Sequence, residues 1–261
     1  MHSDSVYKYR EMMEYLYCHK TARVAELASA LFLSESTVRR ALSVLERQKK
    51  LHRFHGGAAL ADEGEPFSLI RRDQVNHLKE KEVIGRLAAS FVKEGMTLLL
   101  MGGTTVRAIC PYLKGRRLTV ITSSLPVVND LAWEEQIQVI VLGGVLNPSE
   151  MEVRGGLTQL TLGHLRADMM FMGTTGLHPI HGVMTDDPNG VETYAACMRI
   201  SDQVVVLADH TKCEHYVGTT VICGLLDLHC LIVDSGISDT THAFYRENTR
   251  RMEVAGVGEG E

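Results

Sequence analysis

The chain has 261 residues, of which 45% are hydrophobic and 23% are charged, so it is long enough and apolar enough for two domains with buried cores. This composition excludes a disordered or fibrous protein. The first ten residues lack the apolar segment of a signal peptide, and no later apolar run is long enough to span a bilayer, so we expect a cytoplasmic protein with no membrane partner.

The formal charge of −5 is unevenly divided along the chain. Residues 1–57 carry ten Lys and Arg against six Asp and Glu, a net charge of +4, whereas residues 58–261 carry 17 basic and 26 acidic side chains, a net charge of −9. A basic segment on an acidic body is expected where only that segment meets a polyanion.

Helical spacing of apolar residues predicts three short helices in the basic segment. The first follows Ser5, the second covers residues 24–31, and Ser34 or Ser36 supplies an N-cap for the third. The apolar face of the third helix carries three residues: Val38, Leu42 and Leu45. Two short helices that meet at a tight turn are typical of a helix-turn-helix.

The other face of the third helix is polar and basic, which suits insertion into the major groove of DNA. Hydroxyls at its start can contact phosphates or bases, and a basic stretch that ends at Gly56 and Gly57 predicts a β-wing. We expect nine residues to bind double-stranded operator DNA: Ser34, Ser36, Thr37, Arg39, Arg40, Ser43, Arg47, Arg53 and His55. A winged helix that binds protein instead remains an alternative.

Residues 58–78 contain Gly64, Pro66 and mixed charges without an apolar period, so we expect a linker between a DNA-binding domain at 1–57 and a second domain at 79–261. In the second domain, buried apolar runs alternate with amphipathic stretches. The runs cover residues 97–101, 118–122, 137–142, 169–172, 204–208 and 230–233. This alternation predicts an α/β fold, a mostly parallel sheet covered by helices on both faces.

Polar residues and glycines follow these predicted strands, at the edge where parallel sheets bind ligands. A glycine loop with two threonines suits a phosphate, and further hydroxyls with a carboxylate and an ammonium group suit a polyol. The expected effector-binding residues are Gly102, Gly103, Thr104, Thr105, Thr122, Ser123, Ser124, Gly143, Gly144, Asp209 and Lys212. Structural turns and a surface ion pair remain the alternative for the individual motifs.

Histidines at 178, 181, 210 and 215 lack the spacing of a structural zinc site, and six scattered cysteines without a CxxC pair suggest reduced thiols. We therefore expect no metal, no cofactor and no disulfide framework.

Several motifs resemble the DeoR family of bacterial regulators, over nearly the whole chain. The matching segments are residues 24–28, 34–40 and 51–58, then the glycine-threonine loop at 102–105, the pair at 143–144 and the Asp-x-x-Lys turn at 209–212. Three positions depart from the family pattern: Ala41 replaces Asp, Met101 replaces an acidic residue, and Ser123 replaces Asn.

The resemblance implies a fold shared with ribose-5-phosphate isomerase and glucosamine-6-phosphate deaminase. It also implies a repressor of a carbohydrate-catabolism operon, active as a homodimer or homotetramer and induced by a phosphorylated sugar. We expect a non-enzyme. The alternative is a phosphosugar isomerase or deaminase with an appended DNA-binding module, for which Met101 removes one candidate base and Asp209 leaves another.

Overall fold

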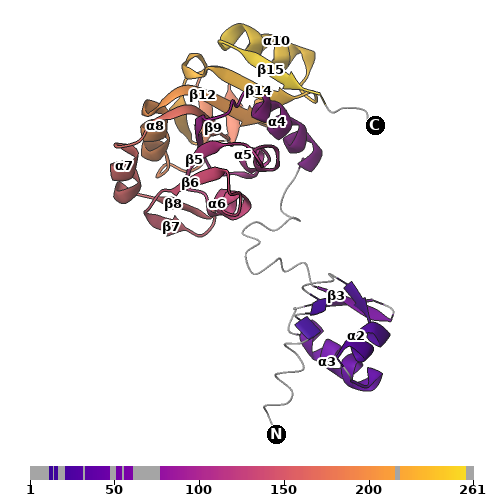
Figure 1. The fold of residues 1–261 in the computed structure, drawn as a ribbon. Coiled ribbons are helices and arrows are strands. Elements are labelled where there is room, and N and C mark those ends of the chain that lie inside the picture. Colours follow the sequence, from indigo (N-terminus) through magenta and orange to yellow (C-terminus); the bar gives the residue numbers. More distant parts are fainter. Residues whose placement is uncertain are drawn as a thin grey trace. The chain divides into compact units, whose positions relative to one another are not determined.

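The structure, a computed structural model, describes residues 12–13, 15–16, 21–31, 33–47, 51–54, 56–60, 77–214 and 218–256. The chain forms two compact units, residues 1–72 and residues 73–261 (Figure 1). Within the described ranges, no helix is long and apolar enough to cross a membrane.

The N-terminal unit is a winged helix. Its elements are β1 (Thr21–Arg23), α2 (Val24–Ala30), α3 (Glu35–Arg47), β2 (Leu51–Phe54) and β3 (Gly57–Leu60), and the strands form an antiparallel sheet in the order β1-β3-β2. Val38, Leu42 and Leu45 of α3 are fully buried against Leu27 of α2 and Leu51 of β2. The predicted second and third helices are confirmed, because one apolar face of each closes this small core.

The wing turns at Gly56, whose φ of 85° is the left-handed conformation that glycine adopts without strain. A Cβ at the neighbouring Gly57 would overlap the Ala22 carbonyl and the Phe54 ring, so only glycine lets β3 pack this closely. The sequence did not predict β1, and β3 extends the winged unit at least to Leu60.

The C-terminal unit is built on a fully parallel seven-stranded sheet of order β15-β14-β12-β9-β4-β5-β6 (Figure 1). Its strands are β4 (Thr97–Leu100), β5 (Leu118–Thr122), β6 (Ile137–Val141), β9 (Ala167–Met172), β12 (Ser201–Ala208), β14 (Cys230–Asp234) and β15 (Met252–Ala255). Two small antiparallel sheets comprise β7 (Val145–Asn147) with β8 (Glu152–Arg154), and β10 (Gly176–His178), β11 (Gly182–Thr185) and β13 (Thr220–Cys223).

Helices cover both faces of the large sheet, which confirms the predicted α/β class. The helices are α4 (Leu78–Ser90), α5 (Thr104–Arg107), α6 (Leu125–Leu131), α7 (Gly156–Leu162), α8 (Val191–Arg199), α9 (Thr211–Glu214) and α10 (Asp239–Asn248), with 3-10 turns η2 (Cys110–Tyr112) and η3 (Leu225–Asp227). Successive strand residues join different cores: Leu98 and Leu100 pack with α4 to α6, and Leu99 packs with α7, α8 and α10. This alternation is why the central strands carry apolar residues toward both faces of the sheet.

The topology fixes where a ligand can bind. The chain enters the sheet at β4, adds β5 and β6 on one side, and then places β9 on the other side of β4. Ligands of open parallel sheets bind beyond the carboxyl ends of the strands, where the strand order reverses. In this chain the reversal lies between β4 and β9, beside Gly102 and Gly173.

Candidate functional site

Hydroxyls cap and surround the start of α3. The Ser34 Oγ accepts a hydrogen bond from the Thr37 backbone amide at 3.2 Å and lies 3.0 Å from the Ser36 hydroxyl and 2.8 Å from the Thr37 hydroxyl. Of the two caps that the sequence left open, Ser34 is the one used. The exposed Ser34 and Ser36 place donors and acceptors at the helix start, where a recognition helix reads DNA.

The arginines of α3 point to solvent. Arg39 pairs with Glu35 one turn earlier, Nη2 to Oε2 at 2.9 Å, with 59% of its side chain exposed. Arg40 donates from Nε to the Ser36 carbonyl at 3.3 Å, and Arg47 is exposed in the last turn. Ala41, where the family pattern has Asp, is buried in the core beside Leu42.

A chain of hydrogen bonds connects the wing to α3. Arg53 of β2 donates from Nη1 to the Ser43 hydroxyl at 2.7 Å, and Ser43 donates to the Arg39 carbonyl at 2.9 Å. The Arg53 backbone amide also donates to Glu46 at 3.2 Å. Arg53 is therefore held beside the recognition helix, whereas the predicted His55 lies outside the described residues.

In the C-terminal unit, the predicted glycine-threonine loop follows β4 at the topological reversal. Gly103 has a φ of 101°, and the space beyond its Cα is open. Thr104 and Thr105 are half-buried, and their hydroxyls form no hydrogen bond with another described residue. Because α5 is a single turn, the loop's amides and hydroxyls must supply any anion contacts, with little help from a helix dipole.

The segment after β5 lies beside this loop, but its hydroxyls differ in availability. The Thr122 hydroxyl donates to the Leu100 carbonyl at 2.7 Å and accepts from the Ser124 amide at 3.1 Å, so it joins β5 to β4. The buried Ser123 and Ser124 have no hydrogen bond from their hydroxyls to other described residues. The Thr122 hydroxyl is therefore already hydrogen-bonded within the protein, whereas the hydroxyls of Ser123 and Ser124 are available to a ligand.

The glycine pair after β6 holds neighbouring elements in place. The Gly143 carbonyl accepts a hydrogen bond from the Thr158 hydroxyl of α7 at 2.7 Å. Gly144, with a φ of 154°, approaches the Arg154 carbonyl so closely that a Cβ would overlap it. This loop therefore anchors α7 and β8.

The Asp-x-x-Lys turn follows β12 and gathers charged groups. Asp209 is 1% exposed and accepts a hydrogen bond from the Thr211 hydroxyl, and the Lys212 amide donates to the Asp209 carbonyl at 2.9 Å. Burial lowers the pKa of Lys81 on α4; Asp209 opposes this shift and Lys212 adds to it. Lys81 therefore lies near both Asp209 and Lys212, and it is a candidate site residue that the sequence prediction did not include.

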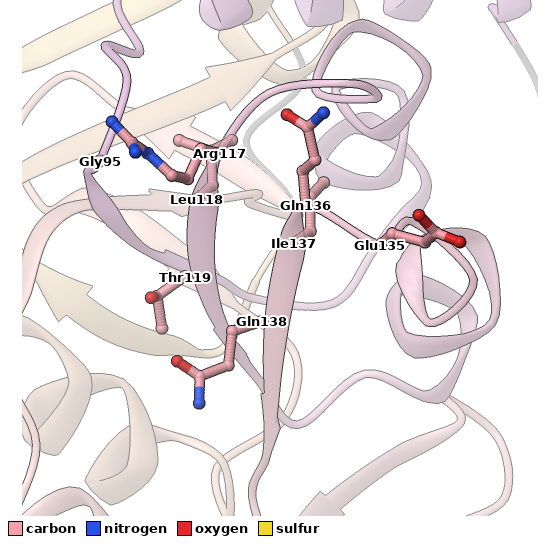
Figure 2. Close-up of a pocket in the computed structure, with 8 residues that line it drawn as sticks. All are labelled: Gly95, Arg117, Leu118, Thr119, Glu135, Gln136, Ile137 and Gln138. Carbon is pink, nitrogen blue, oxygen red and sulfur yellow. The ribbon is translucent and has the colours of Figure 1, made fainter.

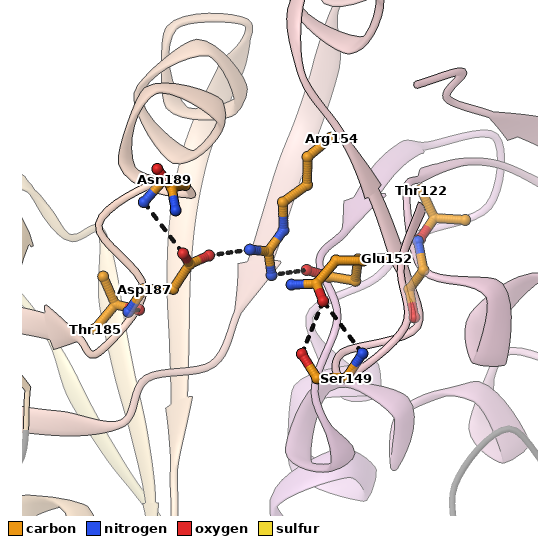
Figure 3. Close-up of polar contacts among 9 residues, drawn as sticks. Thr122, Ser149, Glu152, Arg154, Thr185, Asp187 and Asn189 are labelled. Carbon is orange, nitrogen blue, oxygen red and sulfur yellow. Dashed lines mark hydrogen bonds and ion pairs between the residues drawn. The ribbon is translucent and has the colours of Figure 1, made fainter. Parts of the chain in front are cut away.

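A second set of charged residues near Gly102 was also not predicted. Figure 3 shows Arg154 of β8 between Glu152 and Asp187, with its guanidinium directed at both carboxylates. The Arg154 Nη2 lies 3.4 Å from the Glu152 Oε2, and Nη1 contacts the Asp187 Oδ2. The Asp187 Oδ1 also accepts from the Asn189 amide at 3.1 Å. The sequence signal that could have indicated these residues is the charged pair Glu152 and Arg154, which follows the glycine loop at 143–144.

Figure 2 shows a polar hollow at the other end of the strands, away from the glycine-threonine loop. It is lined by Gly95, Arg117–Thr119 and Glu135–Gln138. It lies at the amino ends of β5 and β6. Ligand sites of open parallel sheets form at the carboxyl ends, so this hollow is a poor candidate for the effector site.

The histidine and cysteine side chains of the described residues make contacts of other kinds. Among these residues, no group of three or more His, Cys, Asp and Glu is placed to hold a metal ion. His178 accepts at Nδ1 from the amides of Ile180 and His181, at 3.0 and 3.2 Å. The five described cysteines are buried and unpaired, and burial raises the pKa of Cys197 to about 12.

A winged helix with an exposed basic face, joined to a parallel α/β unit with a polar ligand edge, defines a DNA-binding transcription regulator with a sensor domain. Residues 9–64 match the model of the DeoR-like helix-turn-helix domain, and residues 76–235 match that of the DeoR C terminal sensor domain. The chain belongs to the DeoR family.

The chain is 30% identical over 233 residues to the HTH-type transcriptional regulator GolR of Listeria innocua serovar 6a, covering 89% of this chain and 91% of that protein. It is 30% identical over 192 residues to the glycerol-3-phosphate regulon repressor of Escherichia coli K12, covering 72% and 74%. Among solved structures, ribose 5 phosphate isomerase A from Neisseria gonorrhoeae aligns with 53% of each chain at 16% identity and a TM-score of 0.38.

Proposed function

We propose that this regulator is a repressor whose affinity for operator DNA falls when its C-terminal unit binds a phosphorylated sugar. The carrying observation is that a glycine loop with available hydroxyls and a pair of lysines stand at the same edge of one parallel sheet. Amides, hydroxyls and ammonium groups are the donors that bind phosphate, and additional hydroxyls suit a polyol.

The phosphate group is assigned to Gly103, Thr104 and Thr105, with Lys81 and Lys212 as neutralising charges. The space beside the Gly103 Cα is open, and the two threonine hydroxyls have no described partner to displace. Burial of Lys81 near Lys212 concentrates positive charge that an anion would stabilise. The name of one relative, a glycerol-3-phosphate regulon repressor, supports a phosphorylated polyol.

The operator is assigned to the exposed face of α3 and to the wing. Ser34, Ser36 and Thr37 present hydroxyls at the helix start, Arg39, Arg40 and Arg47 present charge along it, and Arg53 joins the wing to it. We propose that a homodimer or homotetramer binds paired half-sites. Leu157 and Leu160, 65% and 68% exposed on one face of α7, supply apolar surface for self-association, which sedimentation of the full chain tests.

The same site is proposed to sense its ligand without turning it over. Met101, at the position of a candidate base, is buried in the apolar core, and Asp209 accepts a hydrogen bond from Thr211. A methionine cannot act as a base, and one oxygen of the Asp209 carboxylate is already engaged by Thr211. Incubation with ribose 5-phosphate and glucosamine 6-phosphate tests this, because product formation would contradict a pure sensor.

The decisive experiment selects an operator from random duplex DNA with the full chain and then titrates phosphorylated sugars into the complex. We expect one phosphosugar to release the DNA, while the free sugar and inorganic phosphate at the same concentration release little. An operator complex that no phosphosugar weakens would contradict the assigned effector class, and failure to select any sequence would contradict specific DNA binding.

A further inference from the structure

Glu152 has a feature that the proposed phosphate site does not use. Its side chain is 8% exposed, and its Oε1 is the buried side-chain oxygen that finds no hydrogen-bond partner among the described residues. A buried polar atom without a partner costs free energy, and the cost is greater when the group is charged. Such an atom in a native protein needs an explanation, and a ligand donor supplies one.

The backbone directs Glu152 into the ligand edge of the sheet. Residues 151–153 lie across the segment after β5: the Leu125 amide donates to the Met151 carbonyl at 3.0 Å, and the Val153 amide donates to the Ser123 carbonyl at 3.0 Å. The Glu152 carboxylate then lies against Gly102, where a Cβ would overlap Oε1. A side chain at position 102 would therefore displace the Glu152 carboxylate from this place.

Arg154 pairs with one oxygen of the Glu152 carboxylate and does not contact the other. The guanidinium contacts Asp187 closely and reaches the Glu152 Oε2 at 3.4 Å, which leaves Oε1 open (Figure 3). Two carboxylates around one guanidinium carry a net charge of −1, so this end of the site favours hydrogen-bond donors over phosphate. The lysines near Asp209 lie on the other side of β9, roughly 10 Å away by strand spacing, a span comparable to a phosphosugar.

We propose that Glu152 is a specificity-determining residue that accepts a hydrogen bond from a hydroxyl on the carbon skeleton of the effector. This inference rests on the proposed function and orients its ligand: the hydroxyl end lies at Gly102 and Glu152, and the phosphate lies at Gly103–Thr105 and the lysines. Burial raises the pKa of Glu152, while Arg154 and the nearby backbone amide of Gly102 oppose that rise.

The test compares the full-length wild type with Glu152→Met, which removes the acceptor, and Glu152→Gln, which keeps a neutral one. Glu150→Gln, an exposed acid two residues away, is the matched control. Binding of ribose 5-phosphate, glucose 6-phosphate, glucosamine 6-phosphate and inorganic phosphate is measured by calorimetry. We expect Glu152→Met to weaken the bound phosphosugar about 10- to 100-fold and Glu152→Gln by less, with affinity for inorganic phosphate not reduced in either.

Each other outcome overturns a separate part of the inference. Equal phosphosugar affinity of wild type and Glu152→Met would remove Glu152 from the site while the proposed function stands. Parallel loss of phosphosugar and inorganic phosphate binding would make Glu152 a structural residue. Binding confined to glucosamine 6-phosphate would assign an ammonium donor in place of a hydroxyl, and a wild type that binds none of the sugars would contradict the proposed function and this inference together.

Discussion

The buried carboxyl group of Glu152 should make the free energy of unfolding depend on pH. Burial raises its pKa above the ordinary 4.5, with Glu150 adding to the shift and Arg154 and the Gly102 amide opposing it. A raised pKa means that the Glu152 contribution to the free energy of unfolding is full below pH 4.5 and is lost as pH rises through the raised pKa. Glu152→Gln should therefore gain stability relative to wild type as pH rises.

Urea unfolding of the ligand-free proteins between about pH 4 and pH 8 measures this difference. Glu150→Gln should depart from the wild type much less than Glu152→Gln does, because Glu150 is exposed and is only the smallest contributor to the raised pKa of Glu152. Curves for wild type and Glu152→Gln that stay parallel would show that the carboxylate is solvated or fully paired in the folded chain.

The Glu35–Arg39 ion pair predicts a change in DNA affinity. Glu35→Gln frees the Arg39 guanidinium and removes a carboxylate from the face assigned to the DNA backbone. An exposed pair of this spacing contributes about 0.2–0.5 kcal/mol, so affinity for duplex DNA should rise about 1.4- to 2.3-fold, measured by fluorescence anisotropy. The gain should shrink in an Arg39→Ala background, and an equal gain there would argue against an effect through Arg39.

Residues that act through neighbours in sequence could be predicted, and residues that act through distant contacts could not. The Ser34 cap involves Thr37 three residues on, so a sequence pattern contains it. Glu152 meets Gly102 only because β8 lies across the segment after β5, and Lys81 meets Lys212 only because α4 packs at the end of β12. Single-chain periodicity carries no information on those pairings.

At the scale of elements, the space around two glycines predicts opposite effects of their replacement by alanine. Gly85 of α4 packs against the segment after α5, and Gly163 lies at the end of α7. A Cβ at Gly85 would overlap the Ala108 carbonyl, so Gly85→Ala should destabilise by about 1–3 kcal/mol although alanine favours helix. Gly163 has a φ of −59° and only ordinary contacts around its Cβ position, so Gly163→Ala should be neutral or slightly stabilising.

Thermal unfolding of the two variants beside wild type measures the contrast. A Gly85→Ala protein as stable as Gly163→Ala would show that α4 is free to shift away from Ala108. Circular dichroism keeps the comparison on folded protein, since both variants should retain the wild-type helical signal.

The strands that could be predicted are those with both faces buried. The strands β4, β5, β9 and β14 contain short runs of mostly apolar residues because helices cover both sides, and such runs stand out in the sequence. The short strands were missed: β7 and β8 have only three residues each, and β7 is mostly exposed. Their polar and mixed sequences have no period, and pairing with each other is what makes them strands.

For the whole molecule, the function requires that two separate sites communicate, and substitutions at each site should separate their effects. Arg39→Ala with Arg40→Ala removes two exposed cations from α3, so operator affinity should fall and the slope of log affinity against log salt should weaken by about 2. Lys212→Ala removes a cation proposed for the phosphate, so operator binding should persist while release by phosphosugar is lost.

Thermodynamic linkage makes the same model testable from the other side. If the phosphosugar weakens operator affinity by a given factor, operator DNA must weaken phosphosugar affinity by that same factor, and a coupling of about 1–3 kcal/mol corresponds to roughly 5- to 150-fold. Calorimetric titration of the phosphosugar into the wild-type chain with and without operator measures that factor, and Arg39→Ala with Arg40→Ala should remove the dependence on DNA. Phosphosugar affinity unchanged by saturating operator would mean that the C-terminal unit binds its ligand without controlling the winged helix.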